Sequence, residues 1–336
     1  MSEKMVNTLL KDLSKNDQRQ LFRYLKSIFS TNSNQVSLAA CFETLDTTKK
    51  KKCPHCQSTD IWARGYRNGI RKLTCKKCFK NYSATTGTAL FRINNKEKFL
   101  AYLVCLEDGL TLRQSAKRVG ISLQTSFDWR HKILSSISSI DTDKLTGIIE
   151  ADEMSLPYSE KGKRNLNRES KKRGSGSAKG LSHYDNVTVL ATTDRKKRLF
   201  QLAGKGSLKR ARLNELWEDR IDNESILCSD GNPSYYGYTR DNGIEHKKII
   251  AYKNKRVLKN RAYHIQTINN YHQQIRNWVQ KKFYGVATKY LQNYLNWLSL
   301  KKEMLQMKDS LERLLMWVLT DKTAIEKFKI TKCDLN

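Results

Sequence analysis

The sequence predicts a multidomain protein of the α+β and α/β classes, in which a small β module and a helical domain precede a mixed-sheet domain with C-terminal helices. Three observations carry this prediction. Residues 53–91 are short, turn-rich segments with two cysteine pairs. From Lys96 to about Ile140 the apolar spacing is helical, and from Leu145 strand patterns alternate with helical ones. At ordinary domain sizes, 336 residues are enough for two or three domains.

Composition indicates the class of partner before any motif is considered. The chain has 63 Lys and Arg against 33 Asp and Glu, a formal net charge of +30. An excess of this size favours a polyanionic partner, because neutralising phosphates releases their counterions. A protein that merely coats RNA would have the same charge, so composition alone specifies no reaction.

The sequence has no signal for a membrane or for export. No stretch approaches the ~18 consecutive apolar residues of a membrane span, and the N-terminus lacks the apolar core of a signal peptide. These features predict a cytoplasmic protein without membrane contact. Cytosolic thiols stay reduced, so the eight cysteines are expected to be metal ligands or buried thiols.

These patterns divide the chain into five segments. They are an N-terminal helical segment (1–48), a segment with two cysteine pairs (49–92), a helical DNA-binding domain (93–142), an α/β domain (145–300) and a C-terminal helical segment (301–336). Within the α/β domain, residues 159–182 form an insertion rich in Lys, Arg, Gly and Ser. We expect this insertion to be a mobile loop.

Four cysteines have the spacing of a structural metal site. Cys53 and Cys56 form CPHC, Cys75 and Cys78 form CKKC, and eighteen residues separate the pairs. Two CxxC turns can place four thiolates tetrahedrally around zinc, and the residues between read as two short strands. The sequence therefore predicts a zinc ribbon. The alternatives are four unrelated buried cysteines, or a redox CxxC that would leave the other pair without a role.

A helix-turn-helix is predicted next. Leu112, Ala116 and Val119 form one apolar stripe, Gly120 permits a tight turn, and Ser122 is a suitable N-cap for the following helix. The second helix would present polar and basic groups to the major groove. The residues expected to contact DNA are Gln124, Thr125, Arg130 and Lys132. An ordinary helical hairpin is the alternative.

Carboxylates lie at two strand ends of the α/β domain. The strand LTGIIEADEM contains Glu150, Asp152 and Glu153, and Asp230 directly follows the strand SILCS. Since alternate side chains of a strand share a face, Glu150 and Asp152 should point one way and Glu153 the other. Two carboxylates from adjacent strands can bind Mg²⁺ or Mn²⁺, which suits phosphoryl transfer. Alternatively, Asp152 is an edge charge and Asp230 part of an Asp-Gly turn.

A third acidic ligand is missing from the helix that follows. No Asp or Glu occurs between Glu245 and Glu303. A third ligand there must be neutral, and Asn269, Asn270 and His272 are the candidates. An amide oxygen can coordinate Mg²⁺, though more weakly than a carboxylate.

Together these motifs resemble a known family. CPHC, CKKCFKNYSATTGTAL, GIIEADEM, CSDG and the helical block QTINNYHQQIRNWVQKKFYG are similar to those of DDE-type insertion-sequence transposases, which join a zinc ribbon to an RNase H-like domain. The resemblance covers roughly Cys53 to Leu298. It implies that Asp152, Asp230 and Asn269 take the three catalytic positions, in a branch with Asn where many members have Glu. Arg276 stands where a Lys is usual and can bind phosphate.

The resemblance also implies an activity. A homodimer would bind double-stranded DNA at terminal inverted repeats, cleave it to free 3′-OH ends, and join these to target DNA with Mg²⁺ or Mn²⁺. It would act at the prokaryotic nucleoid. The alternatives are a non-enzymatic DNA-binding regulator with a degenerate RNase H-like domain, and a nuclease of the same fold.

Two further expectations concern surface and core. The insertion and the lysine-rich segment 247–261 are expected to contact the DNA backbone, although a solvated charged loop is the alternative. The candidate residues are Lys172, Arg173, Lys255 and Arg256. Tyr290, Tyr294 and Trp297 recur at helical spacing and are expected in the core.

Overall fold

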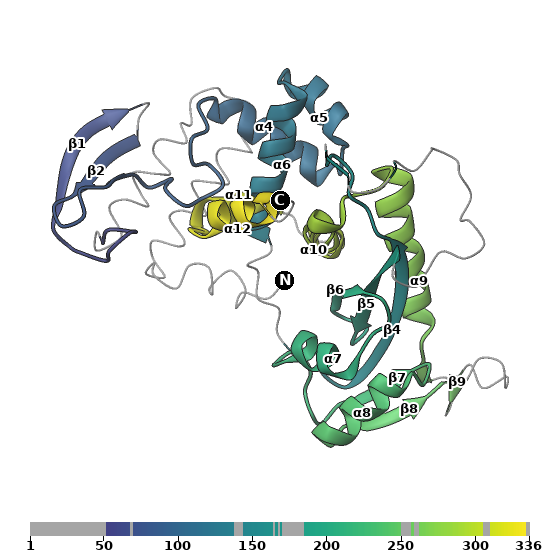
Figure 1. Ribbon diagram of the computed structural model, residues 1–336. Coiled ribbons are helices and arrows are strands. Elements are labelled where there is room, and N and C mark those ends of the chain that lie inside the picture. The colour runs from purple at the N-terminus through teal and green to yellow at the C-terminus, as the bar shows by residue number, and fades with distance from the viewer. Residues whose placement is uncertain are drawn as a thin grey trace. The chain divides into compact units, whose positions relative to one another are not determined.

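A computed structural model describes residues 52–67, 70–137, 144–163, 165–166, 169, 185–249, 257–258, 262–304 and 310–333. The predicted N-terminal helical segment and most of the basic insertion lie outside these residues. The same holds for Lys172, Arg173, Lys255 and Arg256. The chain divides into two compact units, Met1–Asp141 with Lys301–Cys333, and Thr142–Leu300 (Figure 1).

The first unit contains a small β sheet, which with its flanking residues 52–60 and 76–91 we name the cysteine module. Strands β1 (Ile61–Arg67), β2 (Ile70–Cys75) and β3 (Asn81–Tyr82) form an antiparallel sheet in the order β1-β2-β3. Its core consists of Leu73 and Tyr82 together with the buried Cys53 and Cys75. So small an apolar core stabilises little by itself.

Three helices follow, α4 (Lys96–Glu107), α5 (Leu112–Val119) and α6 (Leu123–Ile137). Thr111 and Gln114 form a capping box at the start of α5, and Gly120 ends that helix in the left-handed conformation, with φ of 66°. The Ser122 hydroxyl then accepts a hydrogen bond from Thr125 N at 3.0 Å, which caps α6. Helices α11 (Ser310–Thr320) and α12 (Ala324–Cys333) belong to the same unit.

The second unit is built on a mixed five-stranded sheet in the order β6-β5-β4-β7-β8. Its strands are β4 (Ile148–Pro157), β5 (Asn186–Thr193), β6 (Arg198–Lys205), β7 (Ile226–Ser229) and β8 (Glu245–Lys248). Strands β6, β5 and β4 pair antiparallel, whereas β4, β7 and β8 pair parallel. The predicted mixed sheet is therefore confirmed, with β4 at its centre.

Helices cover both faces of this sheet. Ile149 and Ala151 of β4 pack in one cluster with Trp217 of α7 (Arg210–Trp217) and Tyr235 of α8 (Pro233–Asn242). Alternate residues of β4 point to the opposite face, along which α9 (Gln266–Arg276) runs (Figure 1). The alternation of β4 thus assigns one set of side chains to α7 and α8 and the other to α9.

The second unit is completed by the segments around α9. The short strands β9 (Val257–Leu258) and β10 (Tyr263–His264) precede it, a π-helical turn (Asn277–Lys282) follows, and α10 (Thr288–Met304) comes next. Gln292 of α10 accepts a hydrogen bond from Leu202 N at 2.7 Å and donates to Phe200 O at 2.9 Å, which satisfies the edge strand β6. Three aromatic residues of α10 are buried, as predicted: Tyr290, Tyr294 and Trp297.

None of the helices in the described part of the chain has the length and apolar character needed to cross a membrane.

Candidate active site and metal centres

Three carboxylates meet where the parallel strands of the sheet end. Asp152 and Glu153 come from β4, and Asp230 directly follows β7. One carboxylate oxygen of each lies within 4.8 Å of the others. Asp152 and Asp230 are the predicted pair. Glu153 points to the opposite face of β4, as predicted, where it contacts Asn232 and Tyr235, and its carboxylate still comes close to the other two. Strand β7 pairs with β4 only as far as Glu150, so beyond that point no strand separates Glu153 from its neighbours on this edge.

Crowding changes the protonation of this carboxylate cluster. The pKa of Asp152 is raised to about 7, first by burial and then by the negative charges of Asp230 and Glu153. The Asp152 carboxylate accepts a hydrogen bond from Glu153 N at 3.0 Å. A divalent cation would offset the repulsion between these groups, because it is the largest positive charge that such a site can hold.

Glu153 also connects β4 to the loop that contains Asp230. Its carboxylate accepts hydrogen bonds from Asn232 Nδ2 and from the Tyr235 hydroxyl, both at 2.6 Å. Burial, and next the charge of Glu153, raise the pKa of Tyr235 well above its ordinary value, so this hydroxyl remains a donor. Asn232 is itself the N-cap of α8. Hydrogen bonds to Glu153 of β4 therefore hold the residues that follow Asp230 in place.

The turn after Asp230 requires glycine. Gly231 has φ of +94°, and a Cβ atom there would lie 2.1 Å from Cε of Lys248. The side chain of Lys248 consequently packs directly over this turn.

Helix α9 faces Asp152 with a histidine. His272 Nδ1 lies 3.9 Å from Asp152 Oδ2, and its Nε2 is buried without a hydrogen-bond partner among the described residues. Burial lowers the pKa of His272, and this effect together with the charge of Arg276 outweighs a hydrogen bond to the Asp152 backbone, which raises the pKa. Asn269 is exposed and, three residues before His272, lies on a neighbouring part of the helix surface. Its role as the third catalytic residue stays a prediction.

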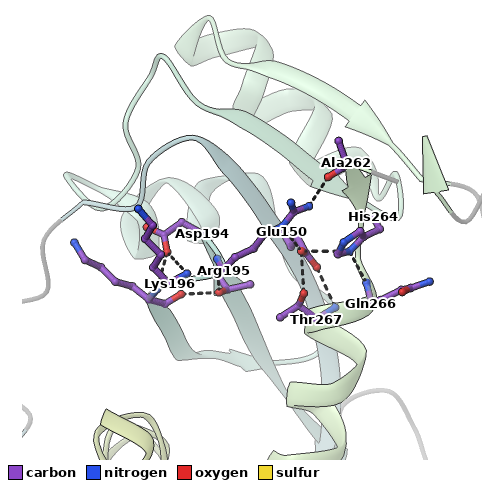
Figure 2. A network of polar contacts seen from close by, with 10 residues as sticks. Glu150, Asp194, Arg195, Lys196, Ala262, His264, Gln266 and Thr267 are labelled. Atoms are coloured by element: carbon purple, nitrogen blue, oxygen red, sulfur yellow. Dashed lines mark hydrogen bonds and ion pairs between the residues drawn. The ribbon is translucent and has the colours of Figure 1, made fainter. Parts of the chain in front are cut away.

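Glu150 lies on the same face of β4 as Asp152, as the strand alternation predicts. It is fully buried, and four groups surround its carboxylate (Figure 2): Arg195 Nε at 3.0 Å, Thr267 N at 3.1 Å, Thr267 Oγ1 at 3.0 Å and His264 Nδ1 at 3.3 Å. These partners are far away in the sequence, so no local pattern could have indicated them.

The four cysteines of the first unit come together as predicted. Sγ of Cys53 lies 3.6 Å from that of Cys78, Sγ of Cys56 lies 3.5 Å from that of Cys75, and all four atoms lie within 4.8 Å of one another. Tetrahedral zinc with Zn–S bonds of ~2.3 Å separates its sulfurs by about 3.8 Å. The pKa of Cys75 is lowered to about 6, first because the backbone N–H of Cys78 donates to its sulfur. The thiolate is the form that binds metals.

The expectation that Arg130 contacts DNA is wrong for this fold. Arg130 is 0% exposed, and its guanidinium donates to Leu110 O at 2.8 Å and to the Ser115 hydroxyl at 3.1 Å. It stabilises the packing of α5 on α6 and offers nothing to a phosphate. Lys132 is half-buried and donates to Phe91 O at 3.2 Å.

The start of α6 is more accessible than its middle. Gln124 is exposed, and the half-buried Thr125 hydroxyl lies 2.8 Å from that of Ser122. Its neighbour Leu123 is 45% exposed. The surface available to a partner is thus the N-terminal end of α6.

The cysteine module exposes aromatic and basic side chains that the sequence analysis overlooked. Trp62 is 57% exposed, Tyr66 64% and Phe79 80%. Arg64 and Arg67 are exposed on the same strand, and Lys76 Nζ lies 5.9 Å from the centre of the Trp62 ring. The alternation of aromatic and arginine residues in IWARGYR was the signal that could have indicated this surface.

The solved structures similar to the chain include a Mos1 mariner paired-end complex with Mn (14% identity, TM-score 0.23, covering 65% of this chain and 79% of that chain). Others are a pre-cleavage Mos1 transpososome (12%, 0.22, 92% and 98%) and a Mos1 paired-end complex with the left transposon end (14%, 0.24, 86% and 91%). No curated protein matches. Residues 144–301, which contain the whole carboxylate cluster, match the model of the ISXO2-like transposase domain family.

Proposed function

We propose that the chain is a transposase that binds the terminal inverted repeats of an insertion sequence, cleaves DNA to free 3′-OH ends and joins these ends to target DNA. The observation that carries the proposal is the carboxylate cluster of Asp152, Glu153 and Asp230 within a transposase-family domain. The mixed sheet with this cluster at the end of its parallel strands supports an RNase H-like fold for the domain.

The donor set of the cluster fits Mg²⁺ or Mn²⁺, hard cations that prefer oxygen ligands. Two bound metal ions would activate water and stabilise charge on the attacking and leaving oxygens of a phosphoryl displacement. Asp152 and Asp230 would hold the metal, and Asn269 would add an amide oxygen. The exposed Arg276 would bind a DNA phosphate near the cluster.

The first unit would recognise DNA. The four cysteines would bind structural zinc and make the cysteine module a zinc ribbon. Exposed Trp62, Arg64 and Arg67 would contact DNA through ring faces and phosphates. Helices α5 and α6 would form a helix-turn-helix, with Gln124 and Thr125 directed at the major groove. Bringing two element ends together would require a dimer.

The test is strand transfer by the full-length protein on oligonucleotides made from the DNA that flanks its gene. With Mg²⁺ or Mn²⁺, we expect 3′ ends to be freed and joined to a target plasmid. Asp152→Ala and Asp230→Ala should each reduce joining by at least about 10³-fold with unchanged DNA affinity, because they remove the metal ligands. Asp219→Ala is the matched control, since this carboxylate is 89% exposed and pairs only with Lys144 among the described contacts.

Each alternative function predicts a different product. If the unmutated protein binds these ends but leaves them uncut, the chain is a DNA-binding regulator. If it cuts without joining and does not prefer the flanking sequence, it is a nuclease. Activity that survives Asp152→Ala would remove the carboxylate cluster from the mechanism.

A further inference from the structure

Glu150 has an ionisable side chain that is fully buried. Its residue is 0% exposed, and it lies at the centre of the sheet, paired with Thr193 on β5 and with Cys228 on β7. A buried carboxylate is costly unless hydrogen bonds and an opposite charge compensate it. Glu150 therefore depends on the groups that surround it.

These groups connect Glu150 to the beginning of α9. Glu150 Oε2 accepts a hydrogen bond from Thr267 N at 3.1 Å, and Oε1 accepts one from Thr267 Oγ1 at 3.0 Å. His264 Nδ1, just before the helix, lies 3.3 Å from Oε1. All three contacts lie within four positions of the chain, 264 to 267, so one carboxylate fixes the entry into α9 (Figure 2).

Arg195 completes the network from the turn between β5 and β6. Its Nε donates to Glu150 Oε1 at 3.0 Å, and its Nη2 donates to Ala262 O. Arg195 has φ of +70°, and Asp194 supports this turn by accepting hydrogen bonds from Lys196 N at 3.0 Å and Lys197 N at 2.6 Å. The turn is thus built around an arginine that contacts both Glu150 and the segment preceding α9.

Helix α9 has no cap of its own. Its N-cap residue is Ile265, whose side chain makes no capping hydrogen bond, and its first turn contains no acidic residue. The first amides of a helix need an acceptor, and its N-terminus favours a negative charge. Glu150 provides both from a strand 117 residues earlier in the chain.

Two contacts then connect β4 and α9 side by side. Glu150 contacts Thr267, and two residues later Asp152 faces His272. Two residues of a strand span ~6.8 Å, and five residues of a helix rise ~7.5 Å, so the spacings on the two elements agree. Asn269 lies between the two contacts in sequence, so its distance from Asp152 depends on both.

We infer that Glu150 is a positioning residue, which caps α9 from β4 and thereby holds Asn269 at the carboxylate cluster. The inference rests on the proposed function, because it assigns Glu150 a part in the same reaction. The side-chain contacts of Glu150 are Arg195, His264 and Thr267, so its part in the reaction is indirect. Its effect is transmitted through Thr267 and the first turn of α9.

The experiment compares Thr267→Val and Glu150→Gln with Asn269→Ala and the double variant Thr267→Val/Asn269→Ala, all in the full-length protein. Thr267→Val removes one donor and keeps the side-chain shape and the backbone N–H, so it tests the inference even where Glu150→Gln unfolds. Gln266→Ala is the matched control, since this exposed neighbour contacts the network only through its backbone. The measurements are the single-turnover cleavage rate, Mn²⁺ affinity by electron paramagnetic resonance, and the melting temperature.

We expect Thr267→Val to slow cleavage about tenfold, because a small displacement of a catalytic group is enough for such a loss. Mn²⁺ affinity should fall by less than the cleavage rate, since Asp152 and Asp230 remain in place and the amide oxygen is the weaker ligand. In the Asn269→Ala background, Thr267→Val should cost less than a further twofold, because there is no longer an amide to position. Gln266→Ala should match the unmutated protein.

Three results would overturn the inference: an unchanged rate in Thr267→Val, an undiminished loss in the double variant, or an Asn269→Ala variant with the unmutated rate. The first two mean that the network only stabilises the fold, and the third that nothing on this turn needs positioning. Each is distinguishable from failure of the proposed function by Asp152→Ala, which abolishes cleavage if only the positioning role is wrong.

Discussion

At the scale of single residues, burial decides what a charged side chain does. Arg130 and Gln124 occupy the same predicted recognition helix, yet Arg130 is fully buried and Gln124 is exposed. The hydrogen bonds of Arg130 end on Leu110 and Ser115 of its own unit. Position in a motif therefore indicated DNA contact for both residues, whereas the packing leaves only Gln124 free to make it.

The pair predicts opposite effects of two substitutions. Arg130→Ala should lower the free energy of unfolding by about 2–4 kcal/mol, because it removes buried hydrogen bonds and leaves space between helices. Gln124→Ala should leave stability within about 0.5 kcal/mol and weaken specific DNA binding. Urea unfolding and DNA titration at matched folded concentrations measure both. A stable Arg130→Ala protein with weakened DNA binding would restore Arg130 to the interface.

Asp152 predicts a pH dependence of stability in the metal-free protein. Its folded-state pKa of about 7 exceeds the ordinary value of 3.8, so between these values the folded state binds a proton that the unfolded state has released. The contribution of Asp152 to stability is therefore fully present below about pH 4 and is lost as pH rises to 7, a change of at most about 4 kcal/mol.

Asp152→Asn removes this titration. After treatment with a chelator, the variant should be more stable than the unmutated protein at pH 8 and nearly equal to it at pH 4, as measured by thermal unfolding. Adding Mn²⁺ at pH 8 should stabilise the unmutated protein but not the variant, whereas Asp219→Asn should behave as unmutated at every pH. Identical pH profiles for Asp152→Asn and the unmutated protein would contradict the raised pKa.

At the scale of elements, local patterns predicted more than contacts between distant segments. The apolar runs predicted β4, β5, β6 and β7, and the strand alternation of β4 placed Glu150 and Asp152 together on one face. Both follow from the period of a strand, which is a local property.

Contacts that depend on where other elements end could not be read from the sequence. The carboxylate of Glu153 reaches the cluster because β7 stops at Ser229, and strand lengths are not encoded near residue 153. Glu150 meets Arg195 and Thr267 across 45 and 117 residues. The missing acid on α9 was visible in the sequence, whereas the approach of His272 to Asp152 depends on how α9 packs on the sheet.

We expect the folded structure of the cysteine module to depend on bound metal. With Leu73 and Tyr82 as its apolar core, β2 should lose most of its stability when Cys75→Ser removes one ligand. Hydrogen exchange at the amides of β2 should accelerate by at least about 100-fold, whereas α6 should keep its protection. The variant should also lose one equivalent of zinc.

Cys105→Ala is the control for this experiment, because that buried thiol lies on α4 outside the quartet. It should keep full zinc content and normal exchange in β2. Unchanged exchange of β2 in metal-free Cys75→Ser protein would show that the module folds without its metal.

At the scale of the whole molecule, the chain passes between its two units twice. Residues 301–333 return to the first unit, so the C-terminal helices that the sequence analysis treated as a separate segment are grouped with the proposed DNA-recognition helices. The carboxylate cluster and the network around Glu150 lie entirely in the second unit. The proposed recognition and the proposed chemistry thus belong to different units of the chain.

A net charge of +30 predicts that DNA binding depends steeply on salt. Only the lysine and arginine side chains that contact DNA phosphates contribute to the slope of log K against log salt. We expect Arg64→Gln/Arg67→Gln to reduce the slope of log K against log salt by about 1.8, since each lost phosphate contact contributes about 0.9. Lys209→Gln/Lys329→Gln removes the same charge from two exposed positions, Lys209 at the start of α7 and Lys329 on α12. This double variant should leave the slope unchanged. Fluorescence anisotropy between 50 and 200 mM salt, about the range over which such contacts are felt, measures both variants. Equal reductions in the two would mean that total charge, rather than the surface of the cysteine module, determines the affinity.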